Sequence, residues 1–163
     1  MEIYLNFTAI VPTQTNWIWA AVAATISRYY DPNSPWTQCA IANSAFNRVD
    51  CCNNPGLCNI SSSLDAGLTA TGNLAFAGGP VTKDSIAGEL GAGNLVCVHI
   101  SWPGGGGEIG IIFGYAEFAG PEDNHFFIYG PASGDVVDVW AFGFCEGYYG
   151  DYDATYFTAA AQP

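Results

Sequence analysis

The chain has 163 residues, which is enough for one domain with a sizeable core and too few for two comfortable ones. Half of the residues are apolar and 11% are charged, which excludes intrinsic disorder and favours a sticky surface or one partly covered by a partner. The net charge of -12 comes from 15 acidic residues against Arg28, Arg48 and Lys83, so we expect no binding to nucleic acid or to an anionic membrane surface.

The N-terminal part of the chain predicts an extended segment followed by a buried helix. Residues 3–11 alternate loosely and indicate an edge strand or an extended arm that ends at Pro12. Asn16 is a predicted N-cap, because its side chain can accept orphan amide protons of the first helical turn. The run from 17 to 30, WIWAAVAATISRYY, is apolar nearly all round, which predicts a central core helix.

Three further helices are predicted, each after a residue whose side-chain oxygen can cap it. They cover about 36–47 after Ser34, with Pro35 at the first turn, about 62–71 after Ser62 or Ser63, and 83–90 after Thr82. A cysteine-rich loop over about 48–60 separates the first two.

The last part of the chain predicts strands instead of helices. Runs rich in β-branched and aromatic residues, separated by glycine and proline turns, cover 95–101, 108–115, 124–129, 135–140 and 154–159. Helices followed by an antiparallel sheet make an α+β fold. We therefore expect a single domain over 1–163, with a helical part over about 12–93 and a β part over about 94–163.

Six cysteines predict disulfide bonds and not a metal site. Zinc ligands usually come in pairs two to four residues apart, often with histidine, but His99 and His125 both lie in apolar runs. Four of the cysteines crowd into twenty residues and allow three pairings, and the last two form a predicted separate pair: Cys39, Cys51, Cys52 and Cys58, then Cys97 and Cys145.

Disulfide bonds indicate an oxidising compartment, so the chain is expected to be secreted or extracellular. The N-terminal segment lacks the basic start and long apolar run of a signal peptide, which predicts a removed signal or another export route. No stretch of about 18 apolar residues predicts a membrane span. We expect no metal and no cofactor, and the pairs Glu122/Asp123, Asp135/Asp138 and Asp151/Asp153 are interpreted as solvated charges and not as calcium ligands.

A series of short motifs resembles a known enzyme family. The segment Asn16-Trp17-Ile18-Trp19-Ala20-Ala21 resembles the N-W-C-W-A-A motif of the secreted bacterial papain-like cysteine peptidases of the AvrRpt2-like type. The resemblance covers nearly the whole chain in the family's order. It continues through Trp36-Thr37-Gln38-Cys39, Ile41-Ala42-Asn43, Asp50-Cys51-Cys52, Cys58-Asn59, Thr71-Gly72-Asn73-Leu74, Ser101-Trp102 with the glycines 104–107, and Gly114-Tyr115.

The resemblance implies a papain-like fold in which the catalytic residues are substituted. The nucleophilic cysteine of the family aligns with Ile18, and its histidine aligns with Glu108. The Asp or Asn that orients the histidine aligns with Gly130, and the oxyanion-hole glutamine aligns with Pro12, close to Gln14. Because the thiolate is the reactive species in such enzymes, a chain without it is expected to be a pseudoenzyme.

The expected function is therefore binding of a protein, a peptide or a small apolar ligand in the former cleft. Residues expected to line this cleft are Trp17, Ile18, Trp19, Trp102 and Glu108. One alternative is a structural or assembly subunit that self-associates, as in a toxin or surface complex. Another is an enzyme that uses a different site, since strand alternation puts Cys97 and His99 on one face, although a buried or disulfide-bonded cysteine beside an ordinary histidine explains that pair more simply.

Overall fold

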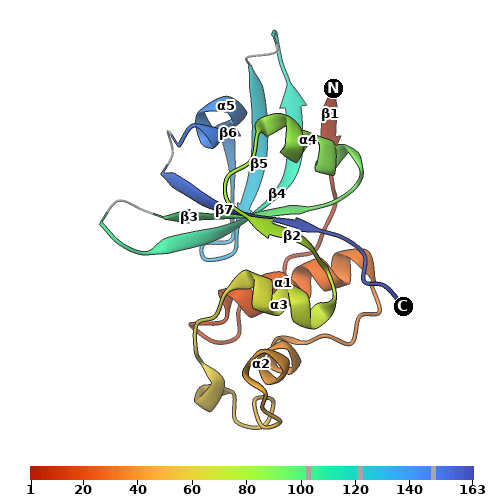
Figure 1. The fold of residues 1–163 in the computed structure, drawn as a ribbon, viewed down its shortest axis with the longest axis vertical. Helices are drawn as coiled ribbons and strands as arrows, with labels where there is room; N and C mark the ends of the chain where they lie inside the picture. The colour runs from red at the N-terminus through yellow and green to blue at the C-terminus, as the bar shows by residue number, and fades with distance from the viewer. Residues whose placement is uncertain (102–103, 121–122, 148–149) are drawn as a thin grey trace. The chain divides into compact units, whose positions relative to one another are not determined.

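The computed structural model describes residues 1–101, 104–120, 123–147 and 150–163. Within these ranges the chain forms five α-helices, one 3₁₀ turn and seven strands, which confirms the predicted α+β class (Figure 1). The chain folds into two compact units. Met1–Asn6 and Phe76–Phe157 form the sheet unit, and Phe7–Ala75 and Thr158–Pro163 form the helical unit.

The helical unit is built around its first helix. Residues Trp19 to Ser27 of this helix are all buried, which confirms the central core helix that its apolar sequence predicts. Gly67 on the third helix lies against it, because a Cβ atom at Gly67 would come 2.9 Å from Ala23 Cβ. The elements of this unit are α1 (Ile18–Tyr30), α2 (Gln38–Phe46), the 3₁₀ turn η1 (Pro55–Cys58) and α3 (Leu64–Thr71).

The cap predicted for α1 is wrong. Trp17 occupies the N-cap position and makes no side-chain capping bond. Asn16 instead pairs with Asn59, whose Oδ1 accepts the backbone N–H of Asn16 at 2.8 Å and whose backbone oxygen accepts Asn16 Nδ2 at 3.0 Å. The oxygen that would cap the helix, Asn16 Oδ1, instead accepts the Ser61 hydroxyl at 3.4 Å, so the whole side chain serves tertiary contacts.

Helix α2 begins at Gln38, two residues later than expected. Ser34 does not cap it, because its hydroxyl bonds Ser27 at 2.6 Å and accepts the backbone N–H of Trp36 at 3.2 Å. Thr37 takes the cap position, and its Oγ1 accepts the backbone N–H of Ala40 at 3.3 Å.

The sheet unit holds strands in the order β2-β7-β3-β4-β5-β6, with β1 beside β4. The pairs β1–β4, β3–β4, β3–β7, β4–β5 and β5–β6 are antiparallel. The elements of the unit are β1 (Glu2–Tyr4), β2 (Leu74–Gly78), α4 (Lys83–Gly91), β3 (Val96–Ser101), β4 (Gly107–Glu117), β5 (Asn124–Gly130), β6 (Asp135–Trp140), α5 (Ala141–Cys145) and β7 (Asp151–Thr158).

One face of this sheet carries the core of the unit. Val96 and Val98 of β3 are buried with Ile86 of α4 and Phe144 of α5, so both helices pack on the same face (Figure 1). Helix α4 thus belongs to the sheet unit and not to the predicted helical part over 12–93. The sequence of this segment predicts a helix correctly. Its position depends on packing against the apolar side chains of the sheet.

Each helix in the described part of the chain is too short or too polar to cross a membrane.

Candidate functional site

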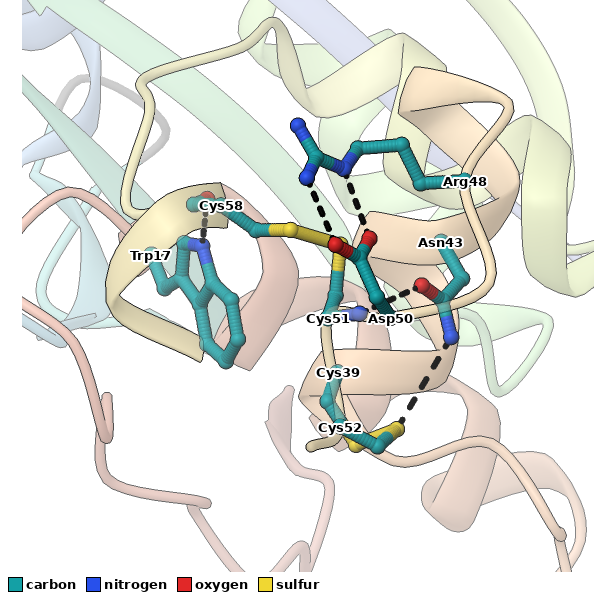
Figure 2. The surroundings of a disulfide bond; sticks show 8 residues. All are labelled: Trp17, Cys39, Asn43, Arg48, Asp50, Cys51, Cys52 and Cys58. Carbon is teal, nitrogen blue, oxygen red and sulfur yellow. Dashed lines mark hydrogen bonds and ion pairs between the residues drawn. A yellow bond between two sulfur atoms is a disulfide. The ribbon is translucent and has the colours of Figure 1, made fainter. Parts of the chain in front are cut away.

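Two disulfide bonds hold the cysteine-rich loop of the helical unit (Figure 2). Cys52 bonds Cys39 on α2, and its neighbour Cys51 bonds Cys58 at the end of η1. The predicted cluster is confirmed, and the structure selects one of the three pairings that the spacing allows. Because two adjacent residues are tied in different directions, the loop is joined to both α2 and η1.

Polar contacts around these bonds fix the same loop. Asp50 receives two hydrogen bonds from Arg48, at 2.8 Å from Nε and 2.7 Å from Nη2 (Figure 2). The hydrogen bonds from Arg48 hold the pKa of the Asp50 carboxyl below its ordinary value. Asn43 Oδ1 accepts the backbone N–H of Cys51 at 2.9 Å. These contacts and the two disulfide bonds together join the loop to α2 and η1.

This loop does not offer a metal site. Among the described residues, Asp50, Cys51 and Cys58 bring possible ligand atoms within 4.8 Å of one another. Both sulfur atoms belong to one disulfide bond, and the carboxylate is already paired with Arg48. A thiolate is what a metal would bind, and this group has none.

The predicted bond between Cys97 and Cys145 is wrong, because both thiols are free. Cys145 packs against the core face of the sheet, together with Val96 and Val98. Cys97 lies between these two valines on β3, so strand alternation turns its side chain to the opposite face. Burial raises the pKa of the Cys97 thiol, and burial followed by the charge of Glu146 raises that of Cys145 to about 11.

In the helical unit, Ile18 is the first residue of α1 and is half-buried. The segment before it is held by Gln38, whose Nε2 donates to the Val11 oxygen at 2.8 Å and whose Oε1 accepts the Thr13 N–H at 3.0 Å. Pro12 lies between these two anchored residues. The sequence prediction did not assign this positioning role to Gln38, although the Trp36-Thr37-Gln38-Cys39 motif pointed to the segment.

The two tryptophans beside Ile18 are core residues. Trp17 is 1% exposed and Trp19 is 2% exposed. Their indole N–H groups donate to the Cys58 oxygen at 2.7 Å and to the Ile60 oxygen at 3.1 Å. Trp19 thus packs inside the helical unit, and its place in a ligand cleft stays a prediction.

Trp17 forms part of the wall of a cavity within the helical unit. The cavity has a volume of about 380 Å³ and also borders Gln14, Arg28 and Trp36. Trp102, the other expected cleft residue, and Glu122 of the carboxylate pairs lie outside the described residues. The slot predicted to join Ile18 to Glu108 stays a prediction, since these residues belong to different units.

In the sheet unit, Glu108 and Gly130 lie next to each other. A Cβ atom at Gly130 would come 2.5 Å from Oε1 of Glu108, so the carboxylate occupies the space that a side chain at 130 would need. These are the two positions at which the sequence resemblance places the histidine and its orienting residue. Glu108 is partly buried, and neither a hydrogen bond nor an ion pair engages its carboxylate within the described ranges.

A cavity of about 280 Å³ opens beside Glu108. Its walls are mainly apolar, and the polar side chains among its described lining residues are Glu108, Ser133 and Asp135. The remaining lining residues come from four strands and α5, namely Ile100, Gly110, Ile128, Gly130, Val137, Val139 and Phe144. A mostly apolar cavity with a few polar groups is typical of a small-ligand site.

Both histidines pair with aspartates. His99 Nδ1 lies 2.7 Å from Asp153 Oδ1, and the Ser101 hydroxyl donates to the other oxygen of this carboxylate. His125 Nδ1 lies 2.5 Å from Asp138 Oδ1. Asp138 and Asp153 therefore each pair with a histidine. This pairing does not conflict with the prediction that they are solvated charges and not calcium ligands. His99 faces Asp153, so the structure provides no bond between its Nδ1 and Cys97.

The sequence matches no protein-family model, and no curated protein matches it. The site is therefore defined by its own geometry and by the sequence motifs given above.

Proposed function

We propose that the chain is a secreted, disulfide-stabilised pseudoenzyme of papain-like architecture that acts by binding a ligand. The motif series supports this proposal, because it runs through nearly the whole chain in the family's order. The α+β arrangement with a buried first helix is compatible with it. The two disulfide bonds support an oxidising compartment.

Loss of peptidase chemistry follows from the residues at the former catalytic positions. Ile18 has no nucleophilic atom, and Pro12 has neither an amide side chain nor a backbone N–H. Removing the nucleophile of a catalytic triad costs on the order of a million-fold in turnover. The free thiols do not replace it, since the raised pKa values of Cys97 and Cys145 keep both in the unreactive thiol form at neutral pH.

The observation that carries the proposal is the cavity at Glu108. The residue stands where the family would place a histidine, yet it borders an apolar space and has no described partner for its charge. A carboxylate without a nucleophile has nothing to activate, whereas an apolar cavity with a few polar groups suits a bound ligand. The geometry thus favours binding over catalysis.

The test restores the missing chemistry in steps. Wild-type protein, Ile18→Cys and Ile18→Cys/Glu108→His are each assayed for casein hydrolysis and for the pH dependence of iodoacetamide labelling. We expect no hydrolysis by wild type, an ordinary thiol in the single variant, and a thiol with a lowered pKa in the double variant, because an adjacent histidine stabilises the thiolate. Hydrolysis by wild type would refute the proposal, and equal labelling profiles of both variants would refute the papain-like placement of these positions.

A second candidate function is assembly of several copies, and the edge strand β6 favours it. The described sheet ends at β6, where Val136 is 56% exposed and Val137 is 49% exposed. Such an edge can pair antiparallel with the same strand of a second copy. Light scattering during size-exclusion chromatography should then show a dimer that Val136→Lys converts to monomer, whereas a wild-type monomer at all concentrations would exclude this function.

A further inference from the structure

We infer that the cavity at Glu108 binds a small organic ammonium ion, with its charged group against the Glu108 carboxylate and its apolar body inside the cavity. The inference rests on the proposed binding function and adds the chemical class of the ligand. It is carried by three features of the sheet unit: the apolar walls, the sign of the charges, and two glycines that make room for the lining side chains.

The apolar walls select the body of the ligand. Ile100, Ile128, Val139 and Phe144 border the cavity, and its volume is about 280 Å³. Ligand sites commonly measure about 300 to 1,000 Å³, so this one suits a molecule with a single ring or a short alkyl chain. Burying such a group favours binding by roughly 25 cal/mol of free energy for each Å² of apolar surface removed from water.

The charges select the sign of the ligand's polar group. Two carboxylates, Glu108 and Asp135, border the cavity, and none of the lining residues that the structure describes is Lys, Arg or His. The described contacts leave the Glu108 carboxylate without a counter-charge, while Ser133 Oγ already accepts the backbone N–H of Asp135 at 3.2 Å. An anion would be repelled here. An ammonium group would supply the missing charge-assisted hydrogen bond.

Two glycines make room for side chains that line the site. A Cβ atom at Gly110 would lie 2.7 Å from Ile128 Cγ2, and one at Gly130 would lie 2.5 Å from Glu108 Oε1. A methyl group at 110 would therefore collide with Ile128, whereas one at 130 would push the Glu108 carboxylate away from its place. Gly130→Ala should be tolerated by the fold, because the atom that it meets is the end of a flexible side chain.

The experiment compares three probes of similar shape by isothermal titration calorimetry at pH 7 and low salt: 2-phenylethylammonium, 2-phenylethanol and phenylacetate. We expect the ammonium probe to bind about tenfold or more tightly than the alcohol, and phenylacetate to bind most weakly, because only the first pairs with Glu108. The peptide Phe-Gly-Gly, with a free or an acetylated N-terminus, tells whether the ammonium can also come from a peptide.

The variants are Glu108→Gln, Gly130→Ala and the matched control Glu2→Gln, which makes the same change on an exposed residue of β1. Circular dichroism and thermal unfolding establish that each is folded. Affinity for the ammonium probe should fall about tenfold or more in Glu108→Gln, fall in Gly130→Ala, and stay unchanged in Glu2→Gln, while affinity for the alcohol changes little in the Glu108 variant.

The inference is overturned if the alcohol or phenylacetate binds as well as the ammonium probe, if Glu108→Gln leaves the ammonium affinity unchanged, or if the ammonium probe fails to bind at millimolar concentration. Equal binding of ammonium and alcohol would leave the proposed binding function intact and refute only the ligand class. Failure of the proposed function is seen separately, as hydrolysis of casein by the wild-type protein.

Discussion

Gly67 decides how closely α3 approaches α1. A Cβ atom there would lie 2.9 Å from Ala23 Cβ and 3.3 Å from the Trp19 ring, and both neighbours are buried in the core of the helical unit. We expect Gly67→Ala to lower the free energy of unfolding by about 1–3 kcal/mol, because the added methyl group overpacks this contact. Urea unfolding followed by tryptophan fluorescence measures the change.

Gly88 on α4 is the matched control. It is exposed, and a Cβ atom there would meet nothing within 4 Å. Gly88→Ala should therefore stabilise its helix, by up to about 1 kcal/mol, since alanine loses less backbone entropy than glycine. If the two substitutions shift unfolding by the same amount and sign, close packing at Gly67 is not the cause.

At the scale of single residues, local sequence rules predicted where helices form better than they predicted which residues contact one another. Thr82 caps α4 as expected, because its Oγ1 accepts the backbone N–H of Ser85 three positions on. Asn16 failed as a cap because its partner, Asn59, lies 43 positions away. The adjacency of Glu108 and Gly130 was equally beyond local rules, since it depends on the packing of two strands.

At the scale of elements, the two disulfide bonds differ in access. Cys52 is exposed and Cys39 is partly buried, whereas Cys51 and Cys58 are fully buried. A reductant needs access to a sulfur atom, so we expect mild phosphine treatment without denaturant to open Cys39–Cys52 first. Alkylation and peptide mass spectrometry identify the thiols that are released.

The same experiment in denaturant is its control, because unfolding exposes all four sulfur atoms. Both bonds should then open at comparable rates. Earlier release of Cys51 and Cys58 from the native protein would contradict the order and would mean that the loop opens before it is reduced.

Sequence patterns located most elements, and the misses have physical reasons. The predicted strands over 124–129 and 135–140 agree with β5 and β6, since β-rich runs bounded by turns are strong signals. Strand β2 was missed because its sequence LAFAG contains no β-branched residue and is largely exposed. Helix α5 was missed because five residues are too few to show helical periodicity.

At the scale of the whole molecule, the order of helices and strands was enough for the α+β class, but cysteine spacing was not enough for the pairings. The observed bonds have sequence separations of 13 and 7, and exchanging the partners of the adjacent Cys51 and Cys52 would change each by one residue, so only positions in space select a partner. The free Cys97 shows the same limit. Its place on one face of β3 follows from alternation, but the place of Cys145 on the other face depends on the docking of α5.

Acid and base should each weaken the sheet unit for a different reason. Burial pushes the pKa of Asp153 up, but the hydrogen bonds from Ser101 and His99 outweigh it and hold that pKa below the ordinary value. A carboxyl with a lowered pKa stabilises the fold above its ordinary pKa, and this contribution is lost as the pH falls through the folded value. Asp153→Asn should therefore flatten the acid side of a plot of Tm against pH.

The two free thiols affect the stability of the sheet unit at alkaline pH. Burial raises the pKa of both, to about 11 for Cys145, so the native state keeps protons that the unfolded chain releases. Their contribution is complete below the ordinary thiol pKa of 9.0 and is lost as the pH rises beyond it. Circular dichroism melting from pH 3 to 10 should show a plateau between about pH 5 and 8. The Tm of the Cys97→Ala/Cys145→Ala variant should fall less between pH 8 and 10 than that of wild type. An equal fall would mean that other groups cause the alkaline loss of stability. Tyr152 is one such group, because burial also raises its pKa.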